Sequence, residues 1–158
     1  EELLLFCAVS QSGGTYNVIT SPDGITWTGR ANLGTNLITV CWSADLGIFC
    51  AVGQDTTASI YTSSDGITWS ANKADELYTV LNSVAWSSAL GVFCAVGGIS
   101  DTLSEHTIFF SYDGDAWYNG ASLYPGIIEW NDIAWSDEIN LFCAVSPVSA
   151  KQTIITAP

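Results

Sequence analysis

A four-residue stretch, Phe-Cys-Ala-Val, occurs four times in this chain and constrains its fold more than any other feature. The copies occupy residues 6–9, 49–52, 93–96 and 142–145. Two further elements recur in a fixed order between them: Ser-x-Asp-Gly-x-x-Trp, found three times, and a Trp-Ser pair that precedes each of the last three copies. A period in the forties indicates a repeat architecture, in which neighbouring units together bury one continuous core.

Each unit is predicted to form four short antiparallel strands. The first ends in Trp-Ser, the second is the Phe-Cys-Ala-Val run, the third precedes the Asp-Gly pair, and the fourth follows it through the Trp. Asp-Gly between two β-rich runs indicates a tight hairpin, because Gly adopts the positive φ that such turns require. The second strand is an unbroken apolar run, so both of its faces are expected to be buried.

Sheets stacked face to face satisfy this pattern, so the repeat predicts an all-β fold of four-stranded β-propeller blades, with a two-sheet sandwich as the alternative. The repeat forms a single region, residues 1–158, with units at approximately residues 1–37, 38–81, 82–130 and 131–158. The first and last units lack a strand each, which leaves about three and a half blades, whereas a propeller has roughly four to eight. We therefore expect part of a larger ring or array that further repeats of the same chain continue. A homo-oligomer that completes the ring is the alternative.

The three Ser-x-Asp-Gly-x-x-Trp segments resemble the Asp-box, or BNR, repeat of β-propellers. The matching residues are Ser21, Asp23, Gly24 and Trp27; Ser63, Asp65, Gly66 and Trp69; and Ser111, Asp113, Gly114 and Trp117. In that family the motif forms the turn between the third and fourth strands of a blade. It occurs in sialidases, other glycoside hydrolases, sortilin-type receptors, bacterial lectins and virion proteins. The Ser-Pro-Asp-Gly-Ile-Thr-Trp variant is most similar to repeat-rich propellers of phage and bacterial surface proteins.

The aspartates of these segments are predicted to be structural. Asp and Ser side chains accept hydrogen bonds from nearby backbone N–H groups and so hold a turn, while a buried Trp anchors it in the core. Being one blade apart, the three carboxylates are not expected to converge on a catalytic or cation-binding centre. The third copy has Asp115-Ala116 where the others have Ile-Thr, which predicts a less regular turn.

The chain is predicted not to be an enzyme, and no catalytic residue is assigned. The sialidases that the repeat resembles hold the substrate carboxylate with a cluster of arginines, whereas Arg30 is the single arginine of this chain. No pair of carboxylates stands out as the acid and base of a glycosidase. Neither a metal nor another cofactor is expected, because the cysteines lack zinc spacing and His106 is the single histidine. The alternative is the scaffold of a carbohydrate-active enzyme, sialidase-like or another glycoside hydrolase, with its catalytic residues outside this stretch.

The net charge limits the possible partners. Sixteen acidic residues and three basic ones give a formal net charge of −13. Binding to nucleic acid relies on Lys and Arg that neutralise phosphates, so that class is excluded, and anionic glycans and membranes are disfavoured. No apolar run reaches the roughly 18 residues of a membrane span, so membrane insertion is not expected. A neutral glycan or a protein is the expected partner.

The five cysteines are predicted to be reduced and buried. Four occupy the same point of the second strand in successive units, one blade apart, which exceeds the ~7 Å Cα–Cα limit of a disulfide. Cys41 stands where the later units have Ala85 and Ala134 and is interpreted as a small core residue. Reduced thiols argue against an oxidising secretory route, and the resemblance implies a virion or bacterial surface.

Candidate ligand-binding residues lie on the longest loops. The loops between the second and third strands, and those between units, open on the face opposite the Asp-box turns and are longest in the third unit. Aromatic and acidic residues on loops of a rigid scaffold suit stacking and hydrogen bonding to a neutral sugar or a protein. The candidates are Asp101, Glu105, His106, Tyr118, Tyr124 and Trp130. Drift between repeats explains the same loops equally well, and His106 is interpreted as an ordinary loop residue.

These features together predict a non-enzymatic binding or structural module. The resemblance implies that it belongs to a phage tail or appendage, or to a cell-surface protein. A neutral-sugar lectin is the third alternative.

Overall fold

The computed structural model of the chain describes residues 3–11, 14–34, 36–54, 60–72, 79–99, 107–120, 129–147 and 154–157. Regular structure within these ranges consists of β-strands, β1 to β14. In the same ranges there is no helix of the length and apolarity that crossing a membrane requires. The fold is all-β, as the sequence predicted.

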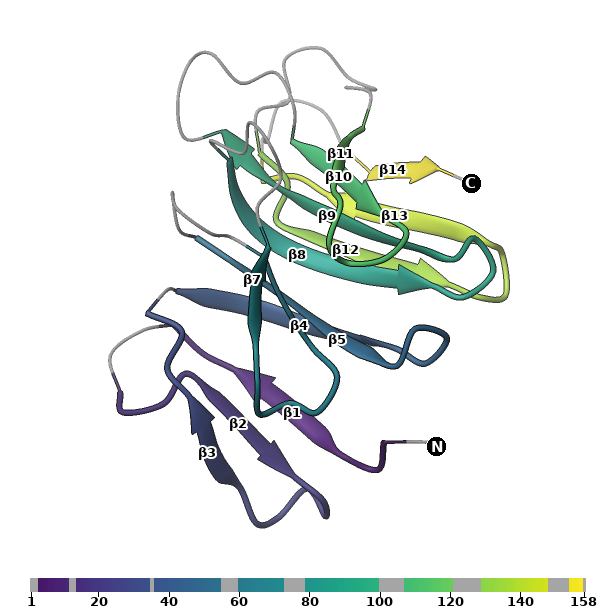
Figure 1. Cartoon of the computed structure of the whole chain (residues 1–158). Coiled ribbons are helices and arrows are strands. Elements are labelled where there is room, and N and C mark those ends of the chain that lie inside the picture. Colours follow the sequence, from purple (N-terminus) through teal and green to yellow (C-terminus); the bar gives the residue numbers. More distant parts are fainter. Residues whose placement is uncertain are drawn as a thin grey trace.

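The strands form four antiparallel sheets that follow one another in chain order (Figure 1). The first sheet contains β1 (Phe6–Val9), β2 (Val18–Ser21) and β3 (Thr28–Ala31). The second contains β4 (Leu37–Ser43), β5 (Ile48–Gly53), β6 (Ile60–Ser63) and β7 (Ser70–Asn72). The third contains β8 (Thr79–Ser87), β9 (Val92–Ile99), β10 (Ile108–Ser111) and β11 (Tyr118–Asn119). The fourth contains β12 (Asp132–Ser136), β13 (Leu141–Val145) and β14 (Ile154–Ala157).

The register of the strands gives every sheet two distinct faces. Because side chains alternate along a strand, the Phe and Ala of each Phe-Cys-Ala-Val run share one face, and the Cys and Val share the other. The Phe also lies opposite a Trp of the neighbouring strand, in the pairs Trp42–Phe49, Trp86–Phe93 and Trp135–Phe142. We call the face with Phe and Ala the leading face, and the face with Cys and Val the trailing face.

Successive sheets pack through these faces to form the core. Each contact places the trailing face of one sheet on the leading face of the next. The residues of the repeated run that meet in this way are Cys7, Val9 and Ala51 between the first two sheets, Cys50, Val52, Phe93 and Ala95 between the second and third, and Cys94, Val96, Phe142 and Ala144 between the third and fourth. This is why both faces of the central strands β5 and β9 are packed, as the apolar run predicted.

The fourth strand of a sheet begins after the Trp and does not contain it, contrary to the prediction. β3, β7 and β11 start at the residue that follows each Trp. In two of the turns the indole N–H donates to the carbonyl of the turn glycine, at 3.3 Å from Trp27 to Gly24 and 2.9 Å from Trp117 to Gly114. The Trp therefore belongs to the turn.

All five cysteines are free thiols, but the prediction that all are buried is wrong, because Cys50 is buried whereas Cys7, Cys41 and Cys94 are half-buried. Cys143 is exposed because it lies on the trailing face of the fourth sheet, which no further sheet covers in the described part of the chain. Burial raises the pKa of Cys41 and of Cys94 to about 12 and that of Cys7 to about 11. Cys41 also lies directly opposite Cys50, a cross-strand pair that the repeat spacing did not reveal.

Candidate binding site

The three Ser-x-Asp-Gly turns are closed by one repeated set of hydrogen bonds. The Ser hydroxyl donates to Asp Oδ1 at 2.9, 3.0 and 3.1 Å in the three copies, and it accepts from the Gly N–H at 2.9, 2.8 and 2.8 Å. The same Asp oxygen accepts from the backbone N–H groups two and three residues later, at 2.7 to 2.9 Å. Both side chains thus bond to the turn itself, as expected.

These hydrogen bonds also lower the pKa of the aspartates. The backbone N–H groups of Thr26 and Ile25 hold the pKa of Asp23 at about 2. The equivalent N–H groups, that of Thr68 foremost for Asp65 and that of Ala116 foremost for Asp113, lower the pKa of these carboxyls as well. Within the described ranges, no three His, Cys, Asp or Glu side chains gather in a way that could hold a metal ion.

The third turn is as regular as the other two, so the prediction of a less regular turn is wrong. Its carboxylate accepts from the N–H groups of Asp115 and Ala116, both at 2.9 Å. These donors belong to the backbone, so the replacement of Ile-Thr by Asp-Ala leaves the hydrogen bonds in place. The replacement changes only the side chains that this turn presents at its surface, Asp115 and Ala116 in place of Ile and Thr.

Burial of the turn Trp depends on the preceding sheet. Trp117 is buried in the cluster between the second and third sheets, and its ring centroid lies 6.3 Å from that of Phe93. Trp27 is exposed because it belongs to the first sheet, whose leading face has no covering sheet in the described residues. The motif anchors its turn only where another sheet precedes it.

The predicted ligand-binding residues have different outcomes. Asp101, Glu105, His106 and Tyr124 lie outside the described residues. Tyr118 lies on β11 with 52% of its surface exposed.

Trp130 is not a surface residue, and its assignment to a ligand-binding loop is wrong. Its side chain is 2% exposed and packs in the cluster between the third and fourth sheets. The indole N–H donates to Thr107 Oγ1 at 3.1 Å, and the backbone N–H donates to the carbonyl of Gly97 at 2.9 Å. Trp130 is a core residue that fastens the start of the fourth sheet to β9.

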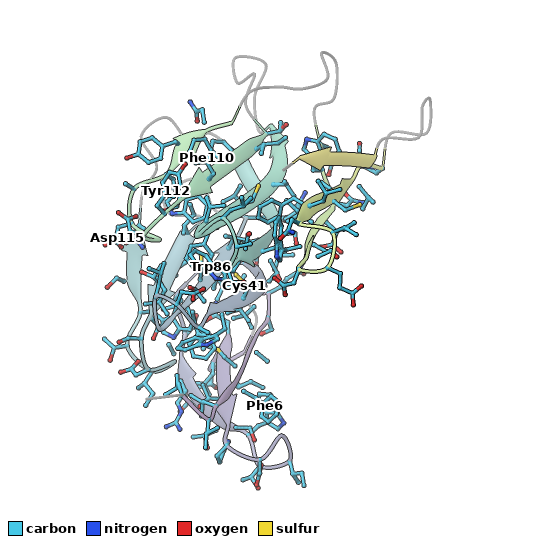
Figure 2. The ribbon with its side chains drawn as sticks, turned by 90° about the vertical axis from the view of Figure 1, so that its right-hand side faces the viewer. Phe6, Cys41, Trp86, Phe110, Tyr112 and Asp115 are labelled. Atoms are coloured by element: carbon cyan, nitrogen blue, oxygen red, sulfur yellow. The ribbon has the colours of Figure 1, made fainter. Side chains whose placement is uncertain are left out.

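Tyr118 belongs to an aromatic cluster on the third sheet in which two Tyr rings are exposed and Phe110 is half-buried against the core between the third and fourth sheets. Tyr118 lies directly opposite Phe110 on β10, and their rings stack with centroids 5.6 Å apart. Tyr112, with 59% of its surface exposed, meets Phe110 edge-on at 5.9 Å. Figure 2 shows Phe110 and Tyr112 along one edge of the molecule, with Asp115 at the same edge. We call Phe110, Tyr112 and Tyr118 the aromatic cluster.

The other two turns have no such cluster. In the third turn, Phe110 precedes the Ser, Tyr112 follows the Ser, and Tyr118 follows the Trp. The other two copies have small residues at these three positions. These residues are Thr20, Pro22 and Thr28 in the first turn, and Thr62, Ser64 and Ser70 in the second. Of the three turns, only the third thus carries aromatic residues at these three positions.

The aromatic side chains replace a polar contact that the first two sheets share. Thr20 Oγ1 accepts a hydrogen bond from Arg30 Nε at 2.7 Å, and Thr62 Oγ1 accepts one from Asn72 Nδ2 at 2.8 Å. In the third sheet the corresponding residues are Phe110 and Gly120. This polar contact has no counterpart in the third sheet, where Phe110 packs half-buried against the core while Tyr112 and Tyr118 face solvent.

Aromatic rings in this arrangement can bind a ligand that offers both apolar and polar groups. Each exposed Tyr presents a rigid apolar face and a hydroxyl that can donate or accept a hydrogen bond. The exposed carboxylate of Asp115 adds a hydrogen-bond acceptor at the same edge. Sequence reasoning missed Phe110 and Tyr112, although comparing equivalent positions of the three repeats would have identified both.

Comparison with protein-family models and with curated proteins gave no match to this chain in either set.

Proposed function

We propose that this chain is a non-enzymatic binding module whose aromatic cluster binds a neutral glycan. The observation that carries the proposal is the replacement of small residues by three aromatic ones at equivalent positions of a single repeat. Two of these rings are more than half exposed, whereas Phe49, Phe93 and Phe142 of the last three Phe-Cys-Ala-Val runs are buried between sheets. Rigid aromatic faces suit the C–H faces of a sugar ring, and the hydroxyl groups suit its polar rim.

The charge of the protein favours a neutral sugar over an anionic one. The formal net charge is −13, and Asp113 and Asp115 lie in the same turn as Tyr112. A sialic acid, a sulfated sugar or a uronic acid would be repelled by this field. A neutral hexose polymer carries no charge and is therefore not repelled.

We also propose that the four sheets are blades of a β-propeller. Four stacked sheets in chain order, three of them with the same Ser-x-Asp-Gly turn, support their interpretation as β-propeller blades of the Asp-box type. In such a scaffold the turns hold the sheets rigid and the ligand binds to residues that differ between blades. The resemblance of the repeat to phage and bacterial surface proteins supports a place on a virion or a cell surface.

A glycan array followed by calorimetry tests the proposal. We expect the protein to bind neutral glycans, and the substitutions Tyr112→Ala and Tyr118→Ala each to weaken binding roughly two- to twelvefold, the equivalent of about 0.5–1.5 kcal/mol. Tyr16→Ala is the matched control, because Tyr16 is also about half exposed but lies in the segment between β1 and β2 of the first repeat. Its affinity should equal that of the unsubstituted protein.

Two results would refute this function. One is the absence of any neutral glycan among the ligands of the array. The other is binding that survives both substitutions in the aromatic cluster. Turnover of aryl glycosides by the chain would instead support a carbohydrate-active enzyme.

A further inference from the structure

The two ends of the stack present the two kinds of face, leading and trailing, that pack together inside the stack. Inside the chain, every trailing face is covered by the leading face of the following sheet. The first sheet presents a leading face, and the fourth sheet presents a trailing face, with no covering sheet in the described residues. Side chains on these two end faces should therefore be more exposed than the equivalent side chains inside the stack.

On the leading face, Phe6 is the exception among four equivalent residues. Its side chain is 58% exposed, whereas those of Phe49, Phe93 and Phe142 are buried. The difference has a local cause, because the ring of Phe6 lies over its own Asp-box turn, near Gly24, with no sheet above it. Figure 2 shows Phe6 at the end of the molecule opposite to Phe110.

On the trailing face, Val145 and Cys143 are the corresponding exceptions. Val145 is 42% exposed, whereas Val52 and Val96 are buried. Cys143 is exposed, whereas Cys50 is buried and Cys94 is half-buried. The side chains that would complete an inter-sheet cluster are present at both ends of the stack.

We propose that the trailing face of the fourth sheet binds the leading face of the first sheet of a second copy of this chain. The occupant is inferred from the chain itself, because the same residue types already meet in this way at three internal contacts. Val145 and Cys143 of one copy would pack against Phe6 and Ala8 of the other. The contact continues an interface that the molecule already uses.

A head-to-tail contact of this kind joins two different surfaces. Such heterologous contacts close into a ring when the rotation between copies allows it and otherwise extend into a filament. In either assembly the contact does not involve the third sheet, which carries the aromatic cluster. This contact is independent of glycan binding, because none of its residues belongs to the aromatic cluster.

Complementation between two variants tests the proposal. Val145→Arg places a charge on the trailing face, and Phe6→Arg places one on the leading face. We expect the unsubstituted chain to form dimers or larger multiples of 16.8 kDa in native mass spectrometry at high micromolar concentration. Each variant alone should be monomeric. A one-to-one mixture should form dimers again, because each variant retains the face that the other has lost.

Matched measurements separate assembly from folding. Leu90→Arg changes an exposed apolar residue in the turn between β8 and β9 and should leave assembly unchanged. Circular dichroism and the melting temperature of both arginine variants should show a folded protein, because Val145 and Phe6 are both partly exposed. Alkylation of Cys143 should be severalfold slower in the unsubstituted chain than in Phe6→Arg, since the contact covers this thiol.

Three outcomes would overturn the proposal. The first is a monomeric unsubstituted chain at all concentrations, which leaves the end faces to a different partner. The second is an unsubstituted oligomer that persists in either single variant, which indicates a contact elsewhere or between identical faces. The third is a mixture of variants that stays monomeric.

Discussion

Asp65 holds its turn through a single oxygen atom. Its Oδ1 accepts hydrogen bonds from the N–H groups of Ile67 and Thr68, at 2.7 and 2.8 Å, and from the hydroxyl of Ser63 at 3.0 Å. The three donors lie within a six-residue segment, residues 63–68, so this geometry is local and could be predicted from the motif alone. The same argument holds for Asp23 and Asp113, which accept the same set of bonds.

Removal of this carboxylate should destabilise the fold without changing ligand affinity. We expect Asp65→Ala to cost roughly 1–2 kcal/mol, as the loss of a helix cap does, and to lower Tm by about 2–8 °C for a chain of this size. Asp65→Asn keeps an acceptor oxygen and should lose less. Asp115→Ala is the control in thermal unfolding, because Asp115 contributes its backbone N–H to the third turn. A loss of glycan binding by Asp65→Ala at unchanged Tm would contradict the structural role.

The lowered pKa values of these aspartates predict how stability depends on pH. A carboxyl with a folded pKa below its unfolded value of about 3.9 stabilises the protein above that value. The contribution disappears as pH falls through the folded pKa, which is about 2 for Asp23. For this group, the turn should therefore lose stability between about pH 4 and pH 2.

Comparison with a non-titrating variant isolates this effect. Acidification also removes the repulsion of a net charge of −13, which acts in the opposite direction. We therefore expect the Tm difference between the unsubstituted chain and the triple variant Asp23→Asn, Asp65→Asn, Asp113→Asn to shrink from pH 5 to pH 2. A difference independent of pH would show that the charge of these residues is irrelevant to stability.

At the scale of strands and sheets, the position of Trp130 shows what the repeat predicts and what it does not. Trp130 precedes Trp135 by the same number of residues by which Leu37 and Leu81 precede Trp42 and Trp86. Both leucines are buried, and so is Trp130. Aligning the repeats on their conserved Trp would have placed Trp130 in the core. The loop assignment relied on the length of the preceding segment, which carries no information about burial.

Substitutions at Trp130 test this core assignment. We expect Trp130→Ala to cost roughly 3–5 kcal/mol, because it empties a packed site between two sheets, and to lower Tm by about 6–20 °C. Trp130→Leu should recover part of the loss, since Leu occupies the equivalent position in the second and third sheets. Tyr118→Ala, at an exposed site, is the comparison and should change Tm little. Equal thermal stability of Trp130→Ala and the unsubstituted chain would contradict burial.

At the scale of the whole molecule, the repeat was sufficient to predict the all-β fold and the stacking that buries both faces of the second strand. No single sequence motif predicted that the faces at the two ends of the stack are exposed. Phe6 and Val145 belong to the same four-residue run as their buried counterparts, and only their place at the ends distinguishes them. The aromatic cluster was predicted only in part, through Tyr118. Comparison of equivalent positions identifies Phe110 and Tyr112 as unusual, but the contact of Tyr118 with Phe110 arises only when β10 and β11 pair.

The measurement that tests the central claim most directly is an NMR titration of the isotope-labelled protein with a neutral oligosaccharide identified on the array. The aromatic cluster predicts that the largest backbone shifts fall in β10 and β11, at Phe110, Tyr112 and Tyr118. The equivalent residues of the second sheet, Thr62, Ser64 and Ser70, provide the internal control and should hardly move. Shifts of equal size at the two sets, or shifts confined to other parts of the chain, would contradict the account.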